Sequence, residues 1–290
     1  MKKTIFILAA ILICSFIKVF PQDSSLRRKA DLHFNNGEWM EALQDFDLLL
    51  QEDPRNREAY AYTVISAMKI ADYTAVAEYM VKAETYRILP DTLLPEINRL
   101  TRELGYPALY ETLLKELGDR IPSWKKKTDY YLLDYYRFRR QHLQVVRIID
   151  EMTGEGEENA ELLKIKAHAL SNACYDREAL KCYERVMELL PDDPVAYVFA
   201  GNYYYLTGLK KLKEAAKRYN SLSSPTRMQY GAFKKEQREV LENEYEKAVR
   251  YLETADRLQP TPALKKTLYD IYVQRADVTR AEAVKRSKKE

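Results

Sequence analysis

The sequence has few cysteines, histidines and glycines, and these shortages exclude several classes of protein. Its 290 residues include 3 Cys, 3 His and 8 Gly. Behind the N-terminal segment only Cys174 and Cys182 remain, which is too few for a disulfide framework, and their spacing is not that of metal ligands. We interpret both cysteines as small buried apolar residues, with a disulfide between them as the alternative, and we expect no metal site.

Catalytic motifs are missing as well. The sequence has no glycine-rich phosphate loop, no Ser or Cys in a nucleophile signature and no His-x-x-x-His pair. Of the three histidines, only His168 falls where a side chain would face a groove, whereas His33 takes a packing position and His142 lies near a helix start. Paired acidic residues such as Asp192 and Asp193 are typical of helix caps. We therefore expect a protein that is not an enzyme and has no cofactor.

Without its N-terminal segment, the chain has no excess of positive or negative charge. The formal net charge is +3, but Lys2, Lys3 and Lys18 all precede the first acidic residue, Asp23. Removing these three lysines from the 47 basic residues leaves 44, against 44 acidic residues. Because a basic surface supplies most of the affinity for nucleic acid, a neutral chain argues against a nucleic-acid partner.

Only one long apolar run occurs, and it stands at the N-terminus. Lys2 and Lys3 precede the uncharged stretch 4–17, which is shorter than the roughly 20 residues that span a bilayer. This arrangement is typical of an export signal. We predict a signal peptide over residues 1–22 and an exported chain, in the periplasm or elsewhere in a bacterial cell envelope. An uncleaved anchor is the alternative, because no small-residue cleavage site precedes Asp23.

Five of the prolines recur at a fixed period along the sequence. Successive members of the set Pro54, Pro122, Pro191, Pro225 and Pro260 are separated by 68, 69, 34 and 35 residues. These separations are multiples of about 34 residues, and no segment alternates at the period of a strand. The period indicates repeated helix pairs.

The clearest pair of helices carries small and aromatic residues at fixed places. Ala179 and Tyr183 lie on one helix, and Gly201 and Tyr204 lie on the next, which we expect to end at Gly208. Small residues suit a close crossing of two helices, and the tyrosines fill the wedge between neighbouring pairs. This pattern resembles the tetratricopeptide repeat family, from about residue 24 to the end.

The resemblance implies an all-α fold. We expect a right-handed α-solenoid of about six to seven tetratricopeptide helix pairs plus a C-terminal capping helix near 263–277, as a single domain over residues 23–290. Two registers are open in the second half. In one, 209–222 is the second helix of a sixth repeat and 227–261 is a seventh. In the other, 209–241 is an insertion, and the helix of residues 197–204 pairs directly with residues 245–257.

Family members of this kind hold a partner peptide or helix in a concave groove. Candidates for partner contact, carried over by register, are Arg99, Arg102, Tyr130, Asp134, Arg137, Lys164, His168, Asn172, Asn202, Tyr205 and Tyr230. The same register adds Arg27, Asp31, Lys127, Phe138 and Phe233. Lys164 and Asn202 are similar to a carboxylate clamp of some members. The resemblance thus implies a scaffold for another protein, with membrane contact only through an uncleaved N-terminal segment. The alternative is a glycan-binding solenoid that uses Tyr130, Tyr205 and Tyr230 as stacking platforms.

Overall fold

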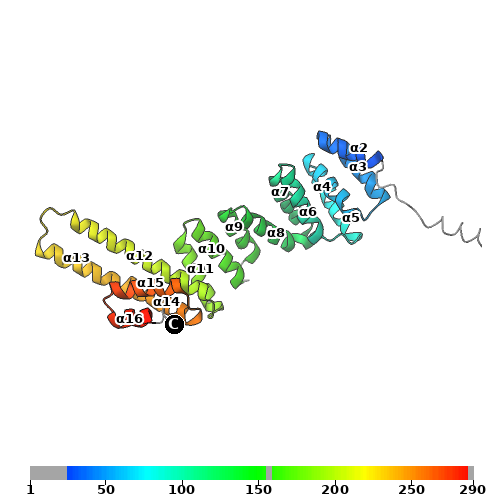
Figure 1. The fold of residues 1–290 in the computed structure, drawn as a ribbon. Coiled ribbons are helices and arrows are strands. Elements are labelled where there is room, and N and C mark those ends of the chain that lie inside the picture. Colours follow the sequence, from blue (N-terminus) through cyan, green and yellow to red (C-terminus); the bar gives the residue numbers. More distant parts are fainter. Residues whose placement is uncertain (1–24, 155–158, 287–290) are drawn as a thin grey trace, which may run out of the picture. The chain divides into compact units, whose positions relative to one another are not determined.

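The fold is known from a computed structural model, which describes residues 25–154 and 159–286, and all regular elements in these ranges are helices (Figure 1). The predicted signal peptide, residues 1–22, lies outside the described residues. Internal contacts divide the chain into two compact units, one up to Leu132 and one from Leu133 onward. The prediction of an all-α fold built from tetratricopeptide-type helix pairs is confirmed. No helix within the described ranges has the length and apolar character that crossing a bilayer requires.

The first unit consists of three helix pairs and the start of a fourth. Its helices are α2 (Ser25–Asn36), α3 (Trp39–Glu52), α4 (Arg57–Lys69), α5 (Tyr73–Thr85), α6 (Pro90–Glu103) and α7 (Pro107–Arg120). The short helix η1 (Pro122–Trp124) leads into α8 (Lys125–Phe138), which continues into the second unit. Consecutive helices pack on each other from α2 to α5 and again from α6 to α7, and α4 also packs on α6. First helices of neighbouring pairs therefore lie side by side, as in a repeat array.

The second unit continues the pairs and contains one long hairpin. After α8 come α9 (His142–Thr153), α10 (Ala160–Asn172), α11 (Asp176–Leu189), α12 (Pro194–Asn220) and α13 (Arg227–Val240). A π-helical turn, η2 (Leu241–Tyr245), joins α13 to α14 (Glu246–Leu258). The last pair is α15 (Pro262–Gln274) and α16 (Val278–Arg286), so the segment expected as a single capping helix is followed by a second helix that packs on it.

The first helix of most pairs ends in the same left-handed turn. Positive φ angles occur at Gly37, Ala71, Gly105, Arg140, Cys174 and Ala276, separated by 34, 34, 35, 34 and 102 residues. At each turn the next backbone N–H donates to a carbonyl five residues earlier, as Glu38 does to His33 at 2.9 Å. This arrangement satisfies carbonyl groups that the helix end leaves without partners. The repeat period is thus set by a recurring turn.

Gly208 stands where the next such turn is expected, 34 residues after Cys174, but no turn forms there. Helix α12 runs for 27 residues through Gly208, so the prediction that Gly208 ends a helix is wrong. Helices α12 and α14 pack directly on each other. The register with an insertion over 209–241 is therefore correct, and the sixth and seventh repeats of the other register are wrong.

Two glycines of α12 allow this helix to approach η2 and α14 closely. A Cβ atom on Gly201 would lie 2.5 Å from Cγ of Leu252, and one on Gly208 would lie 2.5 Å from Cε1 of Tyr245. Both partners are fully buried, and the Tyr245 hydroxyl donates to the Gln274 side chain at 2.5 Å. Side chains larger than glycine at positions 201 and 208 would therefore not fit where α12 crosses η2 and α14.

The two cysteines differ in their surroundings. Cys182 on α11 is partly buried, and burial raises the pKa of its thiol. Cys174 is exposed, because it occupies the left-handed turn after α10 at φ 65°. The interpretation as a buried residue is therefore wrong for Cys174.

Candidate functional site

Several predicted groove residues meet in one pocket of the second unit, between the end of α8 and α10. We call it the α8–α10 pocket, and its volume is about 570 Å³. It is lined by Asp134, Arg137, Arg140, His142, Val145, Ile165, His168, Ala169 and Asn172. The register predicted Asp134, Arg137, His168 and Asn172, but it missed Arg140 and His142. Their position in the sequence was a signal for these two, since they directly follow a first helix whose residues were assigned to the groove.

The turn after α8 places two arginines at this pocket. Helix α8 ends at Phe138, and Arg140 adopts the left-handed conformation at φ 54°. Its backbone N–H donates to the Arg137 carbonyl at 3.1 Å, which closes the turn. His142 then begins α9. One short turn therefore brings Arg137, Arg140 and His142 to the same pocket wall.

Cationic groups outnumber anionic groups in this pocket. Nη1 of Arg137 lies 3.3 Å from the Asp134 carboxylate, and both side chains are exposed. Arg140 forms no ion pair with any residue in the described ranges. On α10, Nδ2 of Asn172 donates to the His168 carbonyl at 2.9 Å and lies 3.1 Å from His168 Nδ1. Two guanidinium groups beside a single carboxylate suit an anionic group, which a guanidinium binds through two parallel hydrogen bonds.

Lys164 is bound by the chain itself. Its Nζ lies 2.6 Å from the carboxylate of Asp193, which is largely buried, and 3.5 Å from Glu161. The hydrogen bond with Asp193 is the main cause that raises the pKa of Lys164. Asp193 also accepts a hydrogen bond from the Val195 backbone N–H at the start of α12. A ligand carboxylate would have to displace Asp193, so this geometry does not favour a clamp built on Lys164 and Asn202.

The remaining cationic candidates lie in the first unit. Arg99 and Arg102 are exposed on α6, and Arg99 pairs with Glu103 at 2.7 Å. Arg27 on α2 forms ion pairs with Asp31 at 2.9 Å and Glu58 at 3.0 Å. Further along, Lys127 lies 3.3 Å from Asp91, and Tyr130 is exposed on α8. None of these side chains lines the α8–α10 pocket, and their role as partner contacts stays a prediction.

The tyrosines proposed as stacking platforms pack against other side chains or lie on separate elements. Tyr205 on α12 is half-buried, with its ring centre 5.5 Å from that of Tyr245 and its hydroxyl 3.5 Å from Gln274 Nε2. Tyr230 belongs to α13 in the insertion, where it packs beside Tyr219, and Phe233 lies on the same helix. Tyr205 and Tyr230 therefore form no joint platform, and glycan binding stays a prediction without a site. Asn202 is half-buried on α12, and Phe138 is exposed at the end of α8.

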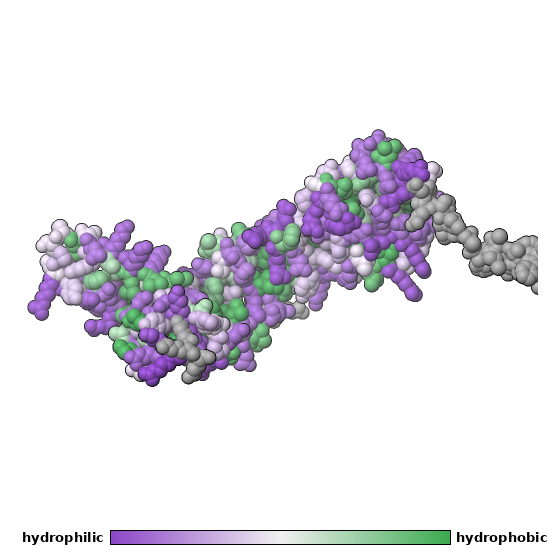
Figure 2. All heavy atoms as spheres, viewed as in Figure 1, coloured by the Kyte–Doolittle hydropathy of each residue, from purple (hydrophilic) through white to green (hydrophobic). Residues whose placement is uncertain are grey.

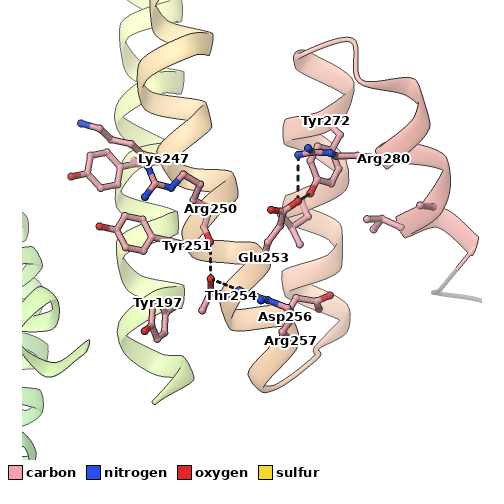
Figure 3. Close-up of a pocket in the computed structure, with 14 residues that line it drawn as sticks. Tyr197, Lys247, Arg250, Tyr251, Glu253, Thr254, Asp256, Arg257, Tyr272 and Arg280 are labelled. Atoms are coloured by element: carbon pink, nitrogen blue, oxygen red, sulfur yellow. Dashed lines mark hydrogen bonds and ion pairs between the residues drawn. The ribbon is translucent and has the colours of Figure 1, made fainter. Parts of the chain in front are cut away.

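A second, larger pocket lies across α14 and was missed by the sequence analysis. Its volume is about 960 Å³, and Figure 3 shows its lining side chains from α12, α14, α15 and α16. The rings of Tyr204 and Tyr251 stack at 5.8 Å, and burial raises the pKa of both hydroxyls. Lys247 lies 5.1 Å from the centre of the Tyr204 ring. One wall of this pocket is thus aromatic and rigid.

Basic residues follow one face of α14 in the same pocket. Lys247, Arg250 and Arg257 are exposed at i, i+3 and i+10, and Arg257 contacts the hydroxyl of Thr254 at 3.1 Å (Figure 3). None of the three forms an ion pair within the described part of the chain. The acidic Glu253 instead accepts a hydrogen bond from the Tyr272 hydroxyl at 2.7 Å and lies 3.4 Å from Arg280. This spacing of basic residues was the signal available in the sequence.

The described residues contain no cluster of three His, Cys, Asp or Glu side chains that could hold a metal ion. What the two pockets offer is hydrogen-bond donors and positive charge on a rigid helical frame.

Comparisons with known proteins show that the chain is similar to solved structures in its fold. No family model matches the chain, and no curated protein matches it. A Bacteroides ovatus structure that carries the provisional name of a protein-binding protein has a TM-score of 0.56 and 22% identity. This match covers 77% of this chain and 99% of that one. The C-terminal part of a TPR repeat-containing protein from Cytophaga hutchinsonii has a TM-score of 0.45 and 13% identity, over 89% and 92% of the two chains.

The similarity to the Bacteroides ovatus structure covers most of both chains and supports the fold described above. Within this chain, seven helix pairs are described, and the first helix of six of them ends in the same turn at the repeat period. Together these observations identify the fold. The chain has the fold of a tetratricopeptide repeat protein.

Proposed function

We propose that the chain is an exported bacterial scaffold that binds an acidic segment of another envelope protein in the α8–α10 pocket. The observation that carries this proposal is the excess of positive charge in that pocket, where Arg137 and Arg140 stand beside one carboxylate, Asp134. The provisional name of the Bacteroides ovatus structure supports binding of a protein. In this proposal the chain binds its partner and performs no reaction.

The physical basis is contact between an anionic group and guanidinium donors on a fixed backbone. The turn fixes the backbone of Arg140 beside the pocket, so only its side chain has to be ordered when its guanidinium meets a carboxylate. Hydrogen bonds to charged groups contribute about 1.5–3 kcal/mol each. The apolar residues Val145, Ile165 and Ala169 form the floor of the pocket and can contact the aliphatic part of an acidic side chain. An acidic residue next to apolar residues therefore fits best.

Charge reversal in the pocket is expected to abolish this binding. The double variant Arg137→Glu and Arg140→Glu replaces two donors by two carboxylates, which should weaken binding of an acidic peptide by about 100-fold or more. The measurement uses the full chain and an array of acidic peptides, followed by fluorescence anisotropy on the best one. Circular dichroism should show unchanged helicity, because both side chains are exposed.

A matched control is available on α11. Arg177 and Lys181 are exposed and form no ion pair in the described ranges, so their reversal to Glu changes the net charge equally outside the pocket. This control should bind like the unchanged protein. Two results would show that the pocket is not the site. One is that the pocket variant binds the peptide as tightly as the unchanged protein does, and the other is that no acidic peptide binds more strongly than basic control peptides.

Export is the second part of the proposal and depends on residues 1–22. The charged end at Lys2 and Lys3 and the apolar run behind it support it. Cells that make the chain should release it with the envelope fraction, and N-terminal sequencing should begin close to Asp23. A chain recovered with the cytoplasmic fraction and with Met1 or Lys2 at its start would contradict export.

A further inference from the structure

The insertion in the second unit forms an arm with an unusual charge. We define the arm as residues 209–240, which comprise the end of α12, the turn and α13. Figure 1 shows α12 and α13 side by side, projecting beyond α14. The arm holds nine basic residues and three acidic ones, a net charge of +6, although the chain from residue 23 onward is neutral. Positive charge is therefore concentrated on the one segment that the repeats do not need.

Most of this charge is not neutralised within the described structure. Lys210, Lys213 and Lys217 are exposed at i, i+3 and i+7 on one face of α12, and Arg227 is exposed at the start of α13. None of these four forms an ion pair with a described residue. In Figure 2 this part of the molecule shows hydrophilic residues beside pale and hydrophobic ones. The carboxylate of Glu236 is bound by Arg218, so it does not offset the free cations.

Apolar side chains are exposed at the tip of the arm. Met228 is 86% exposed, Tyr230 47% and Leu222 38%. Behind them the rings of Tyr219 and Phe233 stack with centres 4.7 Å apart and an angle of 8° between planes. This stack joins the two helices, so the tip is held in place. No acidic residue occurs between Glu214 and Glu236.

We propose that the tip of this arm adsorbs to an anionic phospholipid surface. A surface that combines exposed apolar side chains with surrounding cations, and that lacks carboxylates, matches the interface of an anionic bilayer. Met228, Leu222 and Tyr230 enter the headgroup region, and the lysines contact lipid phosphates. The absence of acidic residues from the whole tip favours lipid over a protein groove, where mixed charges are usual. The association is peripheral and does not depend on the α8–α10 pocket.

Vesicle flotation tests the proposal with the full chain. The probes are vesicles of equal parts phosphatidylglycerol and phosphatidylcholine, compared with phosphatidylcholine alone. The chain should float with the anionic vesicles, and added salt should release it. Neutralising three free cations, as Lys213→Gln, Lys217→Gln and Arg227→Gln, should lower the association constant by about 100-fold. The single variant Met228→Ser should lower it several-fold.

The control removes the same charge elsewhere. Arg55→Gln, Arg177→Gln and Lys181→Gln neutralise three exposed residues outside the arm, and this triple variant should float like the unchanged protein. Residues 1–22 are common to all variants, so binding through them would be equal in all and would not separate the arm variant from the control. Equal binding to neutral vesicles, an equal loss in both triple variants, or no loss in the arm variant would overturn the proposal. Binding of polyglutamate without binding of vesicles would overturn it in favour of an acidic protein.

Discussion

Gly208→Val is expected to lower the free energy of unfolding of the second unit by about 3 kcal/mol. A Cβ atom at this position would lie 2.5 Å from Cε1 and 2.7 Å from Cδ1 of Tyr245. The Tyr245 ring is fully buried and its hydroxyl is bound to Gln274, so it has little freedom to move away. The larger side chain must therefore separate α12 from η2. Urea unfolding followed by circular dichroism measures the effect.

Gly231→Ala is the matched control for this variant. Gly231 lies on α13, and an added Cβ there would meet nothing within 4 Å. Because alanine is the better helix former, the control should raise stability by about 1 kcal/mol. If Gly208→Val is as stable as the unchanged protein, α12 does not approach η2 closely, and the assignment of 209–241 as an insertion fails.

Phe46→Ala is expected to destabilise the first unit by about 4 kcal/mol. Phe46 on α3 is fully buried, its ring stacks on Tyr62 of α4 at 5.0 Å, and Phe34 of α2 lies edge-on at 6.1 Å. Removing the ring leaves a cavity where three helices meet. Because each pair in a repeat array contacts only its neighbours, the loss should be local. Hydrogen exchange should accelerate in α2, α3 and α4 and stay unchanged in α14 to α16.

Phe138→Ala makes the same chemical change at a side chain that is 72% exposed. It should change stability by less than about 0.5 kcal/mol, because little apolar surface is lost from the core. Similar exchange rates in the Phe46 and Phe138 variants would show that the aromatic cluster around Phe46 does not hold the first pairs together.

The turns show how far periodicity carries a prediction of this fold. Gly37, Ala71, Gly105, Arg140 and Cys174 stand at intervals of 34 or 35 residues, and each ends a first helix. Gly208 continues the same series in the sequence but not in the structure. The insertion keeps the phase, since Ala276 follows Gly208 by 68 residues, or two periods. Spacing alone therefore could not distinguish an insertion from a further repeat.

The candidate site was predicted in part for a similar reason. Register placed Asp134, Arg137, His168 and Asn172 on first helices, and the structure brings them to one pocket. Arg140 lies in a turn and His142 begins the helix after it, and the direction of both side chains depends on a left-handed residue that register does not describe. Lys164 was placed on the correct helix, but its partner Asp193 comes from the start of α12. Whether a charged group is free or bound depends on such contacts between helices.

The sequence by itself determined the helical class, the period and the positions of most turns, because these follow from local spacing and from residues that end helices. Only the tertiary structure decided that α12 continues past Gly208 and pairs with α14. The physical reason is the packing of Gly201 against Leu252 and of Gly208 against Tyr245, which joins residues 51 and 37 positions apart. That contact leaves residues 209–240 outside the repeats as a basic arm, and it fixes which charges remain available for a partner.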